Sequence, residues 1–177
     1  MQTVIETKAL CKQYGPHTAV DHVELHVPQG CVYGFIGPNG AGKSTTMKML
    51  LGLIHPTAGR VRLLGQELTE KSRLPLLRQT GSLIESPAGY LHLTAQENLE
   101  IVADLKGVPH KDIGRVLRML ADTGLNGQRM SILLCEQYYD FAQELADDYL
   151  VMERGEVIAR GPGSEMEAKG VRQLVSI

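Results

Sequence analysis

The stretch with the clearest chemical meaning covers residues 37–44 and reads Gly-Pro-Asn-Gly-Ala-Gly-Lys-Ser. It matches the phosphate-loop pattern G-x-x-x-x-G-K-[ST] at every fixed position. Glycines adopt positive φ and carry no side chain, so consecutive backbone N–H groups can face an anion at the positive end of a helix dipole. In such a loop Lys43 reaches the β and γ phosphates of a nucleotide, and the Ser44 hydroxyl is the expected magnesium ligand. The other interpretation, a glycine-rich turn that only connects a strand to a helix, does not account for the full pattern.

The flanking sequence predicts the strand and the helix that this motif requires. Residues 31–36 form a short apolar run, which predicts a buried strand that ends where the glycines begin. From Lys43 onward, apolar residues recur at helical spacing, at Met47, Leu50, Leu51 and Ile54. The turn-forming residues 56–59 then end the predicted helix.

The rest of the chain predicts further strands and helices of a single α/β domain that spans residues 1–177. Strands are predicted at residues 4–10, 19–27, 60–64, 81–84 and 130–135, and a hairpin at 150–152 and 157–159. Helices are predicted from a Thr94–Glu97 capping box to about Lys106, at residues 113–120 ending near Gly124, and at residues 138–145.

Composition and charge exclude several classes of function. The chain has 177 residues, of which 43% are hydrophobic and 21% charged, and its net charge is -2. This balance is ordinary for a globular domain, and it argues against nucleic acid as a partner, because phosphate backbones attract concentrated basic surfaces. No apolar run is long enough to span a bilayer, so we expect any membrane role to act through a partner.

The cysteines and histidines predict no metal site. Three cysteines are widely spaced without a C-x-x-C pattern, which predicts free thiols in a reducing cytoplasm and neither disulfides nor zinc; they are Cys11, Cys31 and Cys135. Six histidines show no metal-ligand spacing with a carboxylate or a cysteine; they are His17, His22, His26, His55, His92 and His110.

The extended motif G-P-N-G-A-G-K-S-T resembles the Walker A loop of ABC transporter ATP-binding subunits. The resemblance implies an α/β P-loop NTPase fold of the ABC ATPase type, with an N-terminal antiparallel β region and a helical subdomain that is incomplete here. It also implies ATP and magnesium as ligands. The residues that it assigns to the loop are Gly37, Pro38, Asn39, Gly40, Ala41, Gly42, Lys43, Ser44 and Thr45.

Three residues outside the loop match further positions of that family. Tyr14 lies where the family places an aromatic residue that stacks on adenine; the alternative is an ordinary tyrosine at a strand end. Glu85 takes the position of the Q-loop glutamine and Gln137 that of the H-loop histidine, so both are predicted to sense the γ phosphate. A carboxylate accepts hydrogen bonds but donates none, so Glu85 would retain only part of that role, and the alternative is a solvated loop acid.

The resemblance changes character along the chain. Residues 1–124 are most similar to ATPases of bacteriocin-immunity and multidrug exporters. From Met130 onward, the sequence is similar to the C-terminal end of urea and branched-chain amino acid importer ATPases. The chain is therefore interpreted as truncated or chimeric, with an internal deletion near residues 122–130.

The family's catalytic segments are absent from the place where this deletion is predicted. Residues 125–129 resemble a signature motif shortened by one glycine, or else form an accidental polar loop. Residues 132–136 imitate a Walker B strand that ends in an acid, but they lack its magnesium-holding aspartate, and no catalytic glutamate follows. Loss of a strand also predicts a marginally stable or oligomerising protein, unless the strand near Met130 fills the gap.

These observations leave two main hypotheses about function. The first is the ATP-binding component of an ABC transporter, peripheral on the cytoplasmic face of the inner membrane. Its partners would be a transmembrane permease subunit and a second nucleotide-binding domain. The second is a pseudo-ATPase that binds ATP without hydrolysis. A P-loop GTPase is disfavoured, because the D-x-x-G match at Asp104 lies within a predicted helix and no N-K-x-D motif is present.

Overall fold

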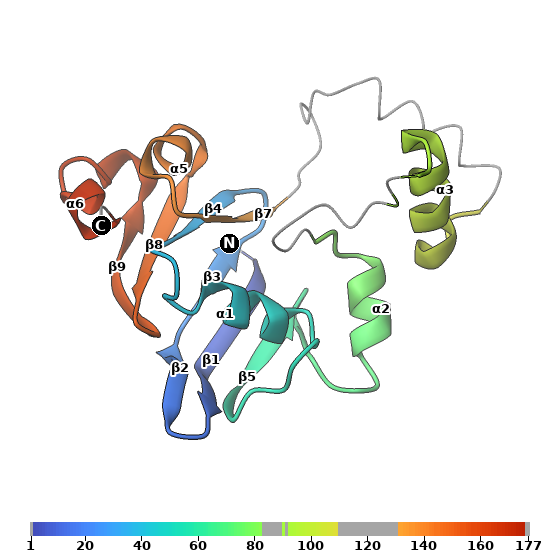
Figure 1. Ribbon diagram of the computed structural model, residues 1–177, viewed down its shortest axis with the longest axis horizontal. Helices are drawn as coiled ribbons and strands as arrows, with labels where there is room; N and C mark the ends of the chain where they lie inside the picture. The colour runs from blue at the N-terminus through green and yellow to red at the C-terminus, as the bar shows by residue number, and fades with distance from the viewer. Residues whose placement is uncertain (1, 83–89, 91, 110–130, 176–177) are drawn as a thin grey trace. The chain divides into compact units, whose positions relative to one another are not determined.

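The computed structural model describes residues 2–82, 90, 92–109 and 131–175 (Figure 1). The chain divides into two compact units, one formed by Met1–Leu76 with Arg129–Ile177 and the other by Leu77–Gln128. Several predicted features lie outside the described residues, namely Glu85, part of the strand at 81–84, the helix at 113–120 and the junction at 122–130.

The first unit contains an antiparallel sheet with the order β2-β1-β5-β6, and β3 pairs with β1 off this path. Its strands are β1 (Thr3–Tyr14), β2 (His17–Val23), β3 (His26–Pro28), β5 (Ala58–Leu63) and β6 (Gln66–Glu67). This confirms the N-terminal antiparallel β region.

The single strand predicted at residues 19–27 is wrong, because the structure divides it into β2 and β3. The buried hydroxyl of Thr7 bridges the break: it donates to the Val23 carbonyl and accepts from the Leu25 N–H, both at 2.8 Å. The Thr7 N–H also donates to the Leu25 carbonyl at 2.9 Å. A side chain on β1 therefore replaces ladder bonds where β2 passes into β3.

A second irregularity in this sheet corrects the prediction about histidines. The β1–β2 register shifts between Leu10 and Lys12, and there Cys11 lies opposite Asp21 and His22. The ligand atoms of these three side chains lie within 4.8 Å of one another. The expectation that no histidine has a cysteine or carboxylate partner is therefore wrong for His22, because a bulge changes where side chains point.

The second sheet of the same unit has the order β7-β4-β8-β9. Its strands are β4 (Val32–Ile36), β7 (Ile132–Glu136), β8 (Asp148–Glu153) and β9 (Glu156–Pro162). β4 is parallel to both β7 and β8, whereas β8 and β9 form the predicted antiparallel hairpin. The strand after the predicted junction thus pairs directly with the strand that precedes the phosphate loop.

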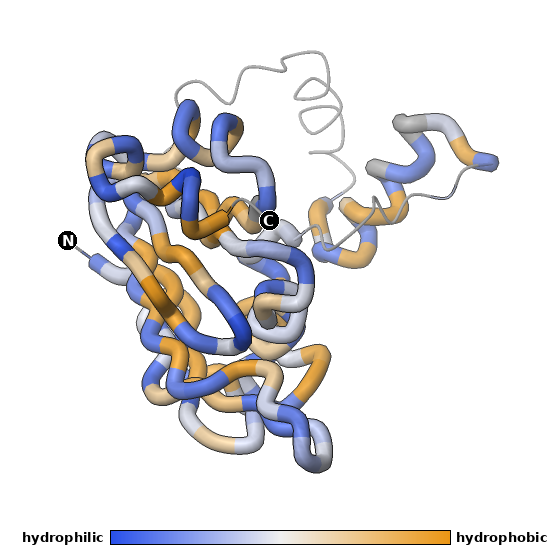
Figure 2. Tube along the Cα trace, turned by 60° about the vertical axis from the view of Figure 1, so that its left-hand side comes forward, coloured by the Kyte–Doolittle hydropathy of each residue, from blue (hydrophilic) through white to orange (hydrophobic). Residues whose placement is uncertain are grey.

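Both faces of the two inner strands, β4 and β8, are buried. Leu150 and Met152 of β8 pack with Phe35 into a core shared with the antiparallel sheet and α1 (Lys43–Leu50). Tyr149 and Val151 face the other way, into a second core. That core is covered by α5 (Tyr139–Leu145), the short 3-10 helix η2 (Gly163–Glu165) and α6 (Val171–Val175). Figure 2 shows hydrophobic and hydrophilic stretches that alternate along the trace of the chain. A parallel strand buried on both faces needs such a continuous apolar run.

Two helices, α2 and α3, lie between β6 and β7 in the sequence. α2 (Arg73–Arg78) is not predicted from sequence; it carries Pro75 in its first turn, where a missing N–H breaks no helical bond. α3 (Ala95–Lys106) begins as predicted, with a complete capping box between Thr94 and Glu97. Gly81 and Ser82, the described part of the strand predicted at 81–84, are not in a strand.

α1 begins at the predicted Lys43 but ends at Leu50, so the apolar spacing out to Ile54 does not mark further helix. The backbone N–H of Leu53 instead donates to the Lys48 carbonyl, and Gly52 has a φ of 62°. Among the residues that the structure describes, each helix is too short or too polar to cross a membrane.

Candidate nucleotide-binding site

The phosphate loop lies between the end of β4 at Ile36 and the start of α1 at Lys43. Because β4 is parallel to β7 and β8, its carboxyl end shares an edge of the sheet with theirs. Ligands of open α/β sheets bind at this edge, and here the edge also meets a helix N-terminus, where backbone N–H groups favour an anion.

Two glycines of the loop are required by close packing. A Cβ on Gly37 would lie 2.1 Å from the carbonyl oxygen of Met152 on β8. Gly42 has a φ of 104°, and its Cβ would lie 2.4 Å from the carbonyl oxygen of Ala19 on β2. The glycines therefore allow the loop to lie against two strands, one from each sheet.

Hydrogen bonds fix the shape of the loop. The Ala41 N–H donates to the Pro38 carbonyl at 3.2 Å, and the Ala41 carbonyl accepts from the Gly155 N–H at 2.9 Å. The buried hydroxyl of Thr46 donates to the Gly42 carbonyl at 3.1 Å. The β8–β9 turn and the first turn of α1 thus brace the loop from two sides.

Lys43 lies over the loop that precedes it. Its Nζ donates to the carbonyls of Gly37 at 2.7 Å and Pro38 at 3.0 Å. Ser44 follows in the first turn of α1 and is exposed, while Thr45 is half-buried. A cation, an exposed hydroxyl and a glycine cradle at a helix start form a donor set that fits magnesium and the phosphates of a nucleotide.

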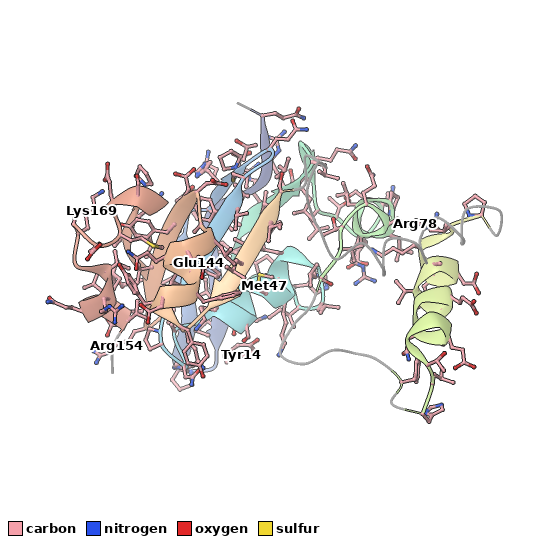
Figure 3. All side chains as sticks on the ribbon, turned by 90° about the horizontal axis from the view of Figure 1, so that it is seen from above. Tyr14, Met47, Arg78, Glu144, Arg154 and Lys169 are labelled. Atoms are coloured by element: carbon pink, nitrogen blue, oxygen red, sulfur yellow. The ribbon has the colours of Figure 1, made fainter. Side chains whose placement is uncertain are left out.

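Two residues outside the loop, Gln137 and Tyr14, are also predicted to contact the nucleotide. Gln137 is half-buried and comes directly after Glu136, whose register partner on β4 is Ile36. Gln137 therefore lies at the edge of the sheet formed by the carboxyl ends of β4 and β7, where the phosphate loop begins. Tyr14 ends β1 and is 49% exposed (Figure 3). The Nζ of Lys12 lies 5.1 Å from the centroid of the Tyr14 ring. The adenine-stacking role of Tyr14 and the γ-phosphate role of Gln137 stay predictions.

The strand that imitates Walker B lies beside the phosphate-loop strand. β7 has the sequence Ile-Leu-Leu-Cys-Glu and pairs with β4 from Val32 to Ile36. It carries no aspartate. Its Leu133 and Cys135 pack against the shared core.

Sequence reasoning missed the residues that support the loop from outside it. Gly155 belongs to a turn that the sequence predicts, but no local signal connects that turn with Ala41. Ala19 and Met152 act through backbone carbonyls, which any residue type would supply. Their role depends on tertiary contacts alone.

Several known proteins are similar to this chain in sequence. The family described as ABC transporter matches residues 20–147, a range that spans the predicted junction. The chain is 46% identical over 121 residues to the bacitracin transport ATP-binding protein BcrA of Bacillus licheniformis, covering 68% of this chain and 39% of that protein. It is 39% identical over 122 residues to the lantibiotic transport ATP-binding protein SrtF of Streptococcus pyogenes, covering 69% of this chain and 50% of that protein.

A third relative aligns along nearly all of this chain. The uncharacterized ABC transporter ATP-binding protein YhcH of Bacillus subtilis is 31% identical over 177 residues, covering 98% of this chain and 56% of that protein. The chain thus spans 39%, 50% and 56% of the lengths of these three relatives.

A solved structure shares the fold. The structure titled "Structure of ATP binding subunit of ABC transporter" superposes with a TM-score of 0.78 at 22% identity, covering 96% of this chain and 95% of that one. The matched family, the three relatives and this fold agree with one another: the chain belongs to the ABC transporter family, as an ATP-binding domain.

Proposed function

We propose that this chain binds magnesium-ATP through residues 37–45 and serves as the ATP-binding component of an ABC transporter. The observation that carries the proposal is the position of Lys43, whose Nζ lies 2.7 and 3.0 Å from two carbonyls of the glycine loop. A bound triphosphate would offer this cation charged oxygens in place of neutral carbonyls, and charge-assisted bonds are the stronger ones.

Ser44 is assigned to the magnesium ion and Tyr14 to adenine. Ser44 is exposed in the first turn of α1, so its hydroxyl is open to an ion at the loop. The half-exposed ring of Tyr14 can stack on a base. Gln137 is assigned to the γ phosphate, since it follows β7 at the edge where the loop begins.

Calorimetric titration with magnesium-ATP tests the binding site. Lys43→Ala is expected to weaken binding by about 100-fold or more, because about 3 kcal/mol of charge-assisted bonding is lost. Lys48→Ala is the matched control, since Lys48 lies in the last turn of the same helix. Equal affinities of the wild type and Lys43→Ala would overturn the proposal.

The same samples separate turnover from binding. The second candidate is ATP binding without hydrolysis, which is considered because the sequence of β7, the strand beside β4, contains no aspartate that could hold magnesium. On that candidate, binding is intact while no phosphate is released above the rate of Lys43→Ala. Release that depends on Lys43 would exclude the non-hydrolysing candidate and leave the first.

The proposed partners are a transmembrane permease subunit and a second nucleotide-binding domain, which would place the chain at the cytoplasmic face of a membrane. Relatives named as bacitracin transport and lantibiotic transport ATP-binding proteins support this assignment. Light scattering with and without magnesium-ATP tests the second partner. A rise in mass that Lys43→Ala abolishes is expected, and a mass that does not respond to nucleotide would contradict pairing of two copies.

A further inference from the structure

The β-bulge between β1 and β2 gathers a thiol, a carboxylate and an imidazole. In a regular strand Asp21 and His22 would point to opposite faces. The register shift between Leu10 and Lys12 places both of them opposite Cys11. Bulges redirect side chains in this way, and they are frequent beside functional sites.

The three side chains already contact one another. The Cys11 Sγ lies 3.9 Å from the Asp21 Oδ1, and that oxygen is hydrogen-bonded to the His22 Nδ1. The backbone N–H of His22 donates to the Cys11 Sγ at 3.2 Å. This bond holds the sulfur on the side of the strand where the carboxylate and the ring lie.

His22 has a φ of 47°, in the left-handed region that non-glycine residues seldom occupy. Such backbone conformations persist only where the surrounding structure enforces them, and they gather at ligand-binding sites. Here the conformation accompanies the bulge that turns the His22 ring toward Cys11 and Asp21.

The geometry suits a small tetrahedral cation. Zinc bonds sulfur at about 2.3 Å and nitrogen or oxygen at about 2.0–2.2 Å, which places neighbouring donors about 3.5 Å apart. The three ligand atoms lie within 4.8 Å of one another, so side-chain movements of about 1 Å bring them to these separations. The side chains of His22 and Asp21 are 75% and 40% exposed, which leaves a path for the ion and for a water as fourth ligand.

We propose that Cys11, Asp21 and His22 bind one divalent cation of the zinc type, at a site separate from the phosphate loop. Sulfur and imidazole ligands select such a cation over magnesium, which prefers oxygen alone. The two sites therefore differ in the metal that they take.

Cobalt(II) titration of the metal-free full chain, in excess magnesium, tests the site. The expected result is one cobalt per chain, with a thiolate-to-cobalt charge-transfer band and the visible bands of a tetrahedral ion. Zinc should displace the cobalt and abolish the charge-transfer band and the visible bands. Absence of the thiolate band in the folded wild type would overturn the proposal.

Two sets of variants identify the ligands. Cys11→Ser is expected to remove the band, while a Cys31→Ser, Cys135→Ser double variant retains it. His22→Asn is expected to lower the zinc affinity on the order of 100-fold while preserving the backbone, because asparagine tolerates positive φ. A band that survives Cys11→Ser contradicts the site. If Cys11→Ser does not fold, the zinc affinity of His22→Asn decides. A lower affinity than that of the wild type would support the site, and an unchanged affinity would contradict it.

Discussion

The backbone N–H of Gly155 donates to the Ala41 carbonyl at 2.9 Å, which ties the β8–β9 turn to the phosphate loop. The carbonyl of Gly155 in turn accepts from the Asp21 N–H at 2.8 Å. Gly155 is buried, whereas its neighbours Arg154 and Glu156 are exposed. One residue of a surface hairpin therefore connects β2 with the proposed nucleotide site.

Replacement of Gly155 by alanine is expected to destabilise the fold and weaken magnesium-ATP binding together. Gly155 has a φ of 91°, and its Cβ would lie 3.1 Å from the Ala19 carbonyl oxygen. We expect a loss of about 2–3 kcal/mol in the free energy of unfolding, measured by denaturant titration.

Gly65→Ala is the control for this prediction. Gly65 has a similar φ of 79°, but its Cβ would meet nothing within 4 Å. Only the conformational term of about 1 kcal/mol is expected there, with ATP affinity unchanged. Equal losses in the two variants would show that the contact with Ala19 is unimportant.

Thr7→Val is expected to lower the free energy of unfolding by about 2 kcal/mol, although the two side chains have nearly the same shape. The substitution removes a hydroxyl that is bonded to both Val23 and Leu25 and leaves their backbone groups buried without those partners. Thr18→Val, at an exposed position of β2, is the control and should change stability little. A cost below about 0.5 kcal/mol for Thr7→Val would mean that the break between β2 and β3 does not depend on this hydroxyl.

Tyr149→Phe is expected to leave stability unchanged or raise it by up to about 1 kcal/mol. The Tyr149 side chain is fully buried, and its hydroxyl has no hydrogen-bond partner among the described residues. A buried polar group without a partner is unfavourable, so its removal costs nothing. Thermal unfolding beside Tyr138→Phe, an exposed control, measures the effect. A clear destabilisation would reveal a bound water or another partner at the hydroxyl.

Acid is expected to loosen the start of α3 through Glu97. Hydrogen bonds from Thr94 lower the pKa of Glu97 below its ordinary 4.5. The bond from the backbone N–H of Thr94 has the larger effect, and the bond from its hydroxyl has the smaller one. A lowered pKa contributes stability that is present above pH 4.5 and lost as the pH falls through the lower folded-state value.

Hydrogen exchange of the α3 backbone amides, corrected for intrinsic rates, measures this loss of stability. The measurement runs from about pH 6 to about pH 3, because this interval includes the ordinary pKa of a glutamate. Glu97→Gln is the matched variant, because glutamine keeps the capping geometry without a titrating charge. The wild type should lose protection relative to Glu97→Gln on acidification. Parallel curves would refute the role of the carboxylate charge.

Local sequence determined the elements whose signals lie within a few residues. The glycine pattern before Lys43 predicted the loop of the proposed site, because its geometry depends on φ values which only glycine adopts readily. The apolar run before the loop predicted its strand, and the apolar spacing after Lys43 predicted the start of its helix. The Thr94–Glu97 capping box and the hairpin turn before Gly155 were predicted for the same reason: neighbouring residues satisfy the backbone groups.

Tertiary structure decided what depends on residues distant in sequence. The hydroxyl of Thr7, on a neighbouring strand, bonds to the last residue of β2, and a shift of register brings His22 to Cys11. Gly155 supports Ala41 through a backbone hydrogen bond, which cannot be predicted from the types of the two residues. Sequence periodicity describes one segment at a time, whereas pairing register and backbone contacts arise only when two segments meet. The sequence by itself therefore determined the phosphate loop, and the packing of the two sheets decided what holds it in place.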